Sequence, residues 1–273
     1  MIREIRITSF EGLISEMESL GKELWFRGVT NKNYSLIPGS VRFDLNGWKE
    51  VSAVLDFMAS YQNHHDYIES NWELYSLMQH YGFPTRLLDW STSVIVALYF
   101  ALDGDADVDD AGSAIDRVVW GMTTGMLNNL NFLNRRVIPT AIGKATTGEK
   151  YLPSPLRKKE GDDFEFEKNP LAVKMPFTNK RVSAQKGCFT IHGSNPKGIE
   201  EIMEENGLGS ELIKFVFDEE AAMAIRKTLY KLDINEDDIY QDLNSLSKRI
   251  VLVNPNWTLL VENFQILQVT DHH

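Results

Sequence analysis

Cysteine is nearly absent from this chain, since Cys188 is the only one among 273 residues. A single cysteine excludes an intramolecular disulfide and any metal site built on paired cysteines. Apolar runs long enough to cross a membrane are also absent. The first residues, MIREIRITSFEG, lack the apolar core of a signal peptide. We therefore expect an intracellular, cytoplasmic protein without a membrane partner.

Familiar ligand-binding motifs are equally scarce. The segment Gly207-Leu208-Gly209 lacks the rest of a dinucleotide fingerprint, and no phosphate-binding loop motif occurs. The acidic segment 103–116 begins like a calcium loop, but Val108 stands where that loop needs glycine and Ala114 where it needs glutamate. We interpret this segment as a solvated surface loop and expect no bound metal.

Positive charge is in deficit. The 28 basic and 39 acidic residues give a net charge of -11 and a pI near 5.1. This imbalance argues against a broad nucleic-acid-binding surface. It leaves room for a local basic groove, although such clusters are more often solvated surface. The candidates are Arg135-Arg136, Arg157-Lys158-Lys159 and Lys180-Arg181.

The first hundred residues are predicted to be mostly helical, with one strand that carries a motif. A half-buried strand is expected at 2–7, and a helix at 9–20 ends at Gly21. A short buried strand then ends on Arg27 and Gly28. The remaining elements predicted here are a turn at 38–40 and amphipathic helices at 51–61 and 72–80.

The second half of the chain has the pattern of a sheet with a few helices. The segment 143–169 is rich in Lys, Glu, Gly and Pro without periodicity, so we expect a long, partly mobile loop or insertion. The tail at 254–271 is apolar enough to pack. Strands are predicted at 118–120, 171–173, 181–185, 188–192 and 212–217, and helices at 221–232 and 242–250. We predict one α+β domain over residues 1–273, with a helical N-terminal part packed on a mostly antiparallel sheet.

The stretch QHYGFPTRLLDWSTSVIVALYFA, at 79–101, carries the densest run of constraints. Gly82 and Pro84 end the preceding helix. Arg86 and Asp89 flank two leucines, which suggests an ion pair at the edge of a core. Ser91-Thr92-Ser93 is an N-cap cluster before an apolar run at 94–102, which we predict to be a buried helix. The polar residues of this stretch would then form a turn held between the end of one helix and the start of the next, which is a rigid way to present polar groups at a pocket.

Three segments together resemble the FRG domain family, which is named for a Phe-Arg-Gly motif. They are Trp25-Phe26-Arg27-Gly28, the run QHYGFPTRLLDW at 79–90, and Arg181 with Gln185, Gly187 and Phe189. A weaker match lies at 235–246. The resemblance covers roughly residues 24–250, and the run at 79–90 is its most specific part. The family name alone implies no chemistry.

The same segments are similar, more distantly, to ADP-ribosyltransferases of the arginine–serine–glutamate type. In that superfamily one strand ends in Arg, a Ser-Thr-Ser segment precedes an apolar helix, and a later strand carries Glu. Here Phe26-Arg27-Gly28, then Ser91-Thr92-Ser93, and then Gln185 on the strand expected at 181–185 occur in that order. The resemblance implies an ADP-ribosyltransferase-like split sheet, with NAD as the substrate.

This resemblance also implies roles for individual residues. Arg27 would bind the NAD phosphate or ribose, and the backbone of Gly28 would bond the carboxamide. Ser91 or Ser93 would bond the ribose or hold the catalytic residue. The expected catalytic residues are Arg27, Ser93, Gln185 and Asp89, and the expected cofactor-binding residues are Arg27, Gly28, Ser91, Thr92, Tyr81 and Arg86, with Tyr81 available to stack on nicotinamide.

Gln185 departs from the superfamily pattern, because glutamine cannot accept a proton or carry negative charge. The acceptor could need little deprotonation, or Asp89 could be the base, or the site could bind without catalysing. Each residue also has a structural interpretation. Arg27, Arg86 and Asp89 could form an ion pair that ties the strand to the turn, Ser91-Thr92-Ser93 could serve only as a helix cap, and His80 could be a cap or surface residue.

The first hypothesis for function is therefore an NAD-dependent ADP-ribosyltransferase that modifies a protein or nucleic acid, as a toxin-like or defence effector. Such an enzyme would be toxic when free, which makes an inhibitory protein partner plausible. One alternative is a non-catalytic nucleotide- or partner-binding module on the same scaffold. Another is an NAD glycohydrolase, which would use the same site with water as the acceptor.

Overall fold

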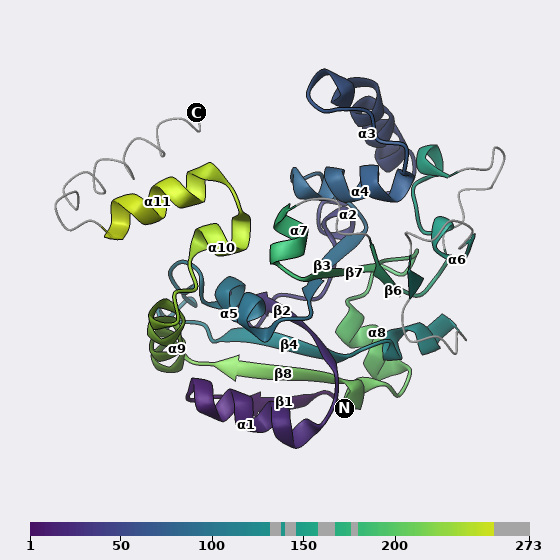
Figure 1. Ribbon diagram of the computed structural model, residues 1–273. Coiled ribbons are helices and arrows are strands. Elements are labelled where there is room, and N and C mark those ends of the chain that lie inside the picture. The colour runs from purple at the N-terminus through teal and green to yellow at the C-terminus, as the bar shows by residue number, and fades with distance from the viewer. Residues whose placement is uncertain (132–137, 140–145, 158–166, 176–179, 254–273) are drawn as a thin grey trace.

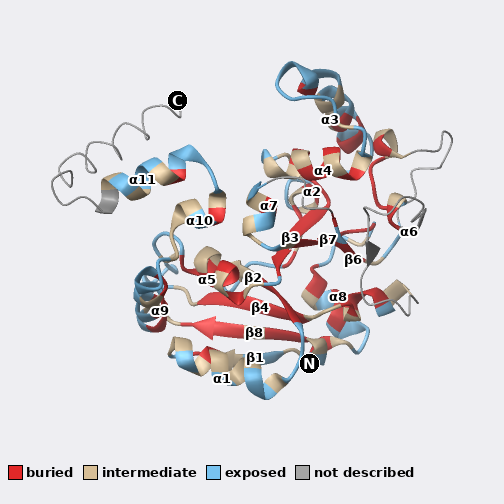
Figure 2. Cartoon of the chain, in the orientation of Figure 1, coloured by how far each residue is buried: buried red, intermediate tan, exposed pale blue. Residues whose placement is uncertain are grey.

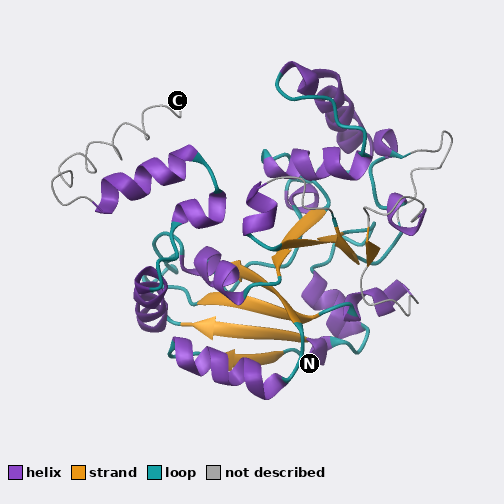
Figure 3. Cartoon of the chain, in the orientation of Figure 1, coloured by secondary structure: helices purple, strands orange, loops and turns teal. Residues whose placement is uncertain are grey.

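One mixed sheet of eight strands organises the chain in our computed structural model, which describes residues 1–131, 138–139, 146–157, 167–175 and 180–253. The strand order is β1-β8-β4-β2-β3-β7-β6-β5, and the edge pairs β1–β8 and β5–β6 are parallel while the other pairs are antiparallel (Figures 1 and 3). The strands are β1 Arg3–Arg6, β2 Leu24–Val29, β3 Leu87–Ser91, β4 Arg117–Thr123, β5 Ile138–Pro139, β6 Leu171–Lys174, β7 Gly187–Ile191 and β8 Leu212–Phe217. This arrangement confirms the predicted α+β class and the mostly antiparallel sheet.

Helices cover both faces of the sheet. Ser9 caps α1, where its hydroxyl accepts from the Gly12 N–H, and Gly21 ends the same helix with a left-handed φ of 56°. The helices are α1 Phe10–Leu20, α2 Gly39–Arg42, α3 Gly47–Ser60, α4 Asn71–His80, α5 Val94–Leu102, α6 Thr146–Glu149, α7 Lys180–Ala184, α8 Ile199–Glu205, α9 Glu219–Lys231, α10 Glu236–Tyr240 and α11 Leu243–Val253. The predicted helix at 94–102 is therefore confirmed as α5.

The buried side chains follow the alternation of the strands. On β2, Phe26 packs in a cluster with α1, α5 and α9, whereas Trp25 packs in a cluster with β4, β8 and α8. A third cluster joins α3 and α4 to β6 and β7. Figure 2 shows the strands β4 and β8 buried along most of their length. Since successive strand residues face opposite sides, both faces of the sheet are core.

Several sequence-based predictions are wrong in detail. The two strands predicted in the first hundred residues, at 2–7 and ending on Arg27 and Gly28, are confirmed as β1 and β2, but a third strand, β3, occupies most of the expected polar turn. The segment predicted as a strand at 181–185 is largely the helix α7. Residues 38–40 belong to the start of α2 instead of a free turn.

The proposed insertion at 143–169 is partly packed core. Tyr151, Leu152 and Leu156 are buried against α4 and β6, so this part of the chain is no loose loop. Residues 143–145 and 158–166 of that segment lie outside the described residues. The predicted packing tail at 254–271 lies outside them as well.

The sheet divides between β2 and β3. β2 pairs with β4 along six residues and β3 pairs with β7 along five, but β2 and β3 share a single pair, Phe26 with Ser91. Beyond that pair the two strands diverge. The helix α5 lies so close to β2 that a Cβ on Gly28 would come within 1.9 Å of the Ala97 carbonyl oxygen. Glycine at position 28 is therefore required for the packing of α5.

Arg86 and Glu50 form a buried ion pair that joins α3 to the start of β3. Arg86 Nε lies 2.8 Å from Glu50 Oε1 and Nη2 lies 2.7 Å from Oε2, while Nη1 donates to the Gly193 carbonyl at 2.8 Å. Arg86 is 6% exposed and Glu50 1%. The predicted pairing of Arg86 with Asp89 is wrong. Asp89 is exposed on β3, whereas the Arg86 side chain is buried and pairs with Glu50, 36 residues earlier in the chain.

We predict that Glu50→Ala destabilises the protein by about 3–5 kcal/mol, because it leaves the buried Arg86 guanidinium without its counter-ion. Urea unfolding followed by circular dichroism measures the change. Lys49→Ala is the matched control on the same helix. It removes an exposed pair with Asp44 that water screens, and should shift the midpoint far less. Equal midpoints for the two variants would contradict a structural role for the buried pair.

Candidate functional site

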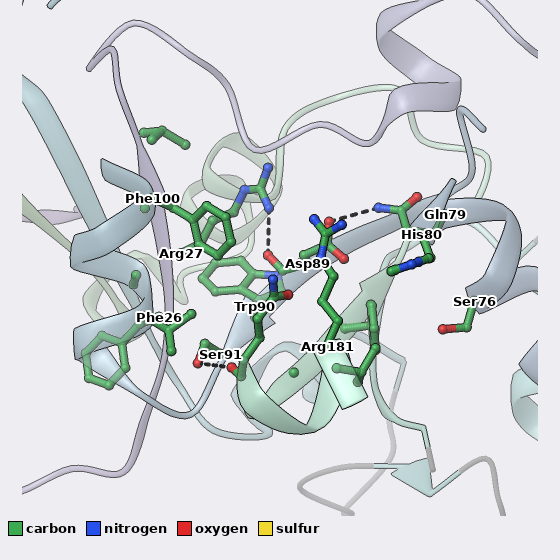
Figure 4. A pocket seen from close by; sticks show the side chains of 18 of the residues that line it. Phe26, Arg27, Ser76, Gln79, His80, Asp89, Trp90, Ser91, Phe100 and Arg181 are labelled. Atoms are coloured by element: carbon green, nitrogen blue, oxygen red, sulfur yellow. Dashed lines mark hydrogen bonds between the residues drawn. The ribbon is translucent and has the colours of Figure 1, made fainter. Parts of the chain in front are cut away.

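The divergence of β2 and β3 leaves a cavity of about 360 Å³ between them (Figure 4). Its walls come from β2, β3, the C-terminal end of α4, one side of α5, and the segment from α7 into β7. This volume lies within the range of small-molecule sites. The polar residues that line it are Arg27, Thr30, Tyr34, Arg42, Ser76, Gln79, His80, Asp89, Ser91, Arg181 and Gln185.

The structure brings five of the predicted site residues together. Arg27, Gly28, Asp89, Ser91 and Gln185 line the same cavity, although they come from segments up to 158 positions apart in the sequence. Arg27 and Gln185, two of the expected catalytic residues, therefore lie at one cavity, whereas Ser93 does not line it.

The other four predicted residues do not line the cavity. Ser93 is the N-cap residue of α5, and its N–H donates to Ser91 Oγ at 2.9 Å. Thr92 is exposed, and Tyr81 is 68% exposed beyond the end of α4. Arg86 is engaged with Glu50 in the core. The sequence-based expectation for these residues came from the resemblance to transferases and from their nearness to Asp89 and Ser91 in the chain, whereas β3 spans only Leu87–Ser91 and the four residues lie on either side of it.

Arg27 bridges the two halves of the sheet. Its Nη1 donates to the main-chain carbonyl of Asp89 at 2.7 Å, across the gap where β2 and β3 no longer pair (Figure 4). Desolvation lowers the pKa of Arg27, with Asp89 opposing that effect. The guanidinium nevertheless stays charged, because an arginine pKa starts above any physiological pH.

Asp89 is the one carboxylate among the described residues that line the cavity. Its Oδ2 accepts from Gln79 Nε2 at 2.9 Å, and Gln79 Oε1 in turn accepts from the Thr85 hydroxyl. Because a carboxylate only accepts hydrogen bonds, the amide of Gln79 is oriented with its nitrogen toward Asp89 and its oxygen toward the Thr85 hydroxyl. The carboxylate is therefore held in place while remaining exposed to the cavity.

Ser91 and Gln185 link the helix α5 to the segment after α7. Ser91 Oγ donates to the Gln185 carbonyl oxygen at 2.7 Å and also accepts from Ser93 N. The Gln185 side chain donates from Nε2 to the Ile239 carbonyl oxygen at 3.2 Å. Gln185 thus lies on the turn between α7 and β7, and not on a strand as the sequence suggested. Its side-chain amide also connects this turn to α10.

The cavity is more basic than the rest of this acidic protein. Arg27, Arg42 and Arg181 line it, against the single carboxylate of Asp89. Arg181 stacks on the Tyr240 ring, with its Cζ 4.7 Å from the ring centroid. Among the described residues of the predicted basic clusters, Arg181 lines the cavity. Arg135, Arg136, Lys158 and Lys159 lie outside the described residues.

Sequence reasoning missed Arg42, Gln79 and His80 as cavity residues. Arg42 ends the single turn of α2, which has no sequence signature that points to a site. Gln79 and His80 are the first two residues of the QHYGFPTRLLDW run and the last two of α4. Their position in this specific run is the feature of the sequence that could have indicated a role at the cavity.

His80 is half-buried at the C-terminal end of α4. Desolvation lowers its pKa below the ordinary value of 6.5, and the positive charge of Arg181 acts in the same direction, while Asp89 opposes both. The imidazole is therefore mostly neutral at neutral pH. Neutral imidazole has one nitrogen free to accept a proton.

Over the described residues, no group of three or more His, Cys, Asp or Glu side chains is arranged to hold a metal ion. No helix in the described part of the chain combines the length and apolar character needed to cross a membrane.

Comparison with known proteins identifies one family. The family model of the FRG domain matches residues 22–110, which include β2, β3, α4, α5 and most of the lining of the cavity. The predicted resemblance to that family is thereby confirmed over this segment. No curated protein and no solved structure matches the chain.

We predict that two substitutions move the pKa of His80 in opposite directions. Arg181→Ala removes a nearby positive charge and should raise it, and Asp89→Asn removes a negative charge and should lower it further. Titration of the imidazole resonances by NMR, with the His80 signal assigned from a His80→Gln variant, measures both shifts.

Lys180→Ala is the control for this titration, because it removes one positive charge from the same helix at an exposed position. It should leave the His80 pKa close to that of the unmodified protein. A His80 pKa that is the same in all the variants would show that Asp89 and Arg181 do not reach this imidazole.

Proposed function

We propose that this chain, whose residues 22–110 match the FRG domain, is an NAD-dependent ADP-ribosyltransferase that binds NAD in the cavity between β2 and β3. The main support for this proposal is the position of three sequence motifs in the structure. The Arg27-Gly28 motif, Ser91 and Gln185, which resemble the three separate elements of the arginine–serine–glutamate transferases, converge on a single cavity. β2, β3 and β7 are neighbours in the sheet, so the fold itself brings these three segments to one place.

The charges of the cavity fit a dinucleotide. NAD carries a pyrophosphate, which needs cationic groups, and guanidinium groups present planar donors to phosphate oxygens. Arg27, Arg42 and Arg181 provide three such groups in a chain whose net charge is -11. A local positive field inside an acidic protein attracts anionic ligands to that one place. Phe100 adds apolar surface for a flat ring system.

The chemistry that we propose is the transfer of ADP-ribose. The bond between the ribose C1 and the nicotinamide nitrogen breaks, the bonding electrons go to nicotinamide, and the sugar passes through a cation like that of glycoside cleavage. Asp89 supplies the negative charge that stabilises this cation. The amide oxygen of Gln185, whose nitrogen is occupied by Ile239, can accept a hydrogen bond from a ribose hydroxyl.

The acceptor that we propose is a cellular macromolecule, either protein or nucleic acid. The purified chain mixed with NAD labelled on the adenylate and with a cell lysate tests this directly. Label that resists nuclease but is lost to protease identifies a protein acceptor, and the reverse identifies a nucleic acid. Free ADP-ribose without macromolecular label would replace the proposal with a glycohydrolase, and NAD that stays intact would replace it with a binding module.

Two variants then separate binding from chemistry. We predict that Asp89→Asn lowers kcat by about 10²-fold or more, because asparagine keeps the shape but loses the charge. Arg27→Ala should chiefly raise KM for NAD, because Arg27 contacts the ligand in its ground state as well as in the transition state. Initial rates of nicotinamide release measure both.

Arg6→Ala serves as the control, since it removes an arginine of similar charge from the exposed edge strand β1, where it pairs with Asp116 and Asp218. Its kinetics should match those of the unmodified protein. An Asp89→Asn variant that is folded and fully active would rule out Asp89 as the group that stabilises the cation.

A further inference from the structure

Transfer to a hydroxyl or amide acceptor needs a group that takes up a proton, and Gln185 cannot do so. The described residues that line the cavity include three arginines, which remain protonated, and Tyr34, whose hydroxyl donates to Asp107 at 3.0 Å. That leaves two groups in the lining able to accept a proton at neutral pH. They are Asp89 and His80.

Asp89 already has other functions at this site. Its carboxylate accepts from Gln79, its carbonyl accepts from Arg27, and the sugar cation requires its negative charge. A carboxylate that takes the acceptor's proton would lose that charge as the cation forms. The two demands conflict on one side chain, so a second group is better suited to the proton.

His80 has the geometry for this second role. Its side chain lines the cavity from the end of α4, and Figure 4 shows it beside Gln79 on the Asp89 side of the cavity. Within the described part of the chain neither ring nitrogen makes a hydrogen bond, and the ring contacts the edge of Tyr81 at a centroid distance of 4.9 Å. A half-buried imidazole in a cavity wall without a hydrogen-bond partner is available to a ligand.

We propose that His80 is the general base that receives the proton of the acceptor, with Asp89 as the electrostatic stabiliser of the sugar cation. This inference rests on the proposed transferase function and divides its two steps between two side chains. It makes His80 a catalytic residue, because the ring contacts the acceptor atom that reacts.

The step balances in protons and electrons. The lone pair of the acceptor oxygen or nitrogen forms a bond to the ribose C1 as the bond from C1 to nicotinamide breaks. The electrons of the broken bond return to the nicotinamide ring, which leaves as a neutral molecule. The acceptor's proton passes to the free ring nitrogen of His80. The resulting imidazolium faces Asp89 and afterwards releases its proton to water.

The surroundings of His80 set its pH dependence. Asp89 faces it from β3, Arg181 from α7 and Tyr81 from the end of its own helix. Burial and Arg181 keep the pKa of the imidazole low, so the neutral, proton-accepting form is present at neutral pH. The rate should therefore fall only at acid pH, as His80 becomes protonated, and Asp89 should stabilise the imidazolium that forms during each turnover.

Chemical rescue tests this assignment. We predict that His80→Ala lowers kcat for nicotinamide release by about 10²–10⁴-fold without changing KM for NAD, and that added imidazole restores much of the lost rate. The assay contains NAD and a cell lysate as the source of acceptor. His64→Ala, at an exposed histidine after α3, should behave like the unmodified protein. Added imidazole can replace the missing side chain as a proton acceptor, but it cannot restore activity that was lost through a structural defect.

The outcomes separate the two proposals. If the unmodified protein releases no nicotinamide, the transferase function fails and this assignment fails with it. If the unmodified protein is active and His80→Ala keeps its kcat, or loses it without rescue by imidazole, the function stands and His80 is not the base. A pH–rate profile of His80→Gln supplies a second measurement, because the acid limb due to His80 should disappear in that variant.

Discussion

A single backbone pair, Phe26 with Ser91, connects the two halves of the sheet, and the site depends on it. β2 is secured by β4 along its other edge and β3 by β7, so each strand keeps a complete ladder on one side while the two diverge from each other. Divergence creates both the cavity and unpaired main-chain groups on its walls. Arg27 satisfies one of these by donating to the Asp89 carbonyl, which explains why an arginine lies at this point of β2.

The helix α5 holds this opening in shape. It can approach β2 closely because Gly28 lacks a Cβ, and its own buried side chains join the cluster that contains Phe26. Its N-cap residue, Ser93, donates to Ser91 at the end of β3, and Ser91 in turn donates to the Gln185 carbonyl. Packing forces therefore position polar groups from β2, β3 and α7 around one space, with rigid elements behind each of them.

The elements with strong local signals were predictable from the sequence. Ser9 and Gly21 mark the ends of α1, and the cap cluster with the apolar run after Ser91 indicates α5. The approach of Arg27, Ser91 and Gln185 could be anticipated only through the resemblance to transferases, because nothing in the local pattern of any of the three refers to the others.

The remaining errors come from interactions that have no local signature. Arg86 has an opposite charge three residues away in Asp89, but its partner is Glu50 on α3, and sequence spacing cannot show a contact made by tertiary packing. Gln185 follows the five-residue helix α7, which is too short to leave a periodic pattern and was predicted as a strand. Arg42 belongs to a one-turn helix, too short to leave a periodic pattern.

An experimental structure with NAD bound would show whether the dinucleotide occupies the opening that Arg27 spans. Crystals of the Asp89→Asn variant, which should turn over slowly, would be soaked with NAD. We expect density for the dinucleotide between β2 and β3, with phosphate or ribose oxygens within hydrogen-bonding distance of the Arg27 guanidinium and the nicotinamide ribose facing position 89. NAD bound elsewhere, or a cavity left empty at saturating NAD, would contradict it.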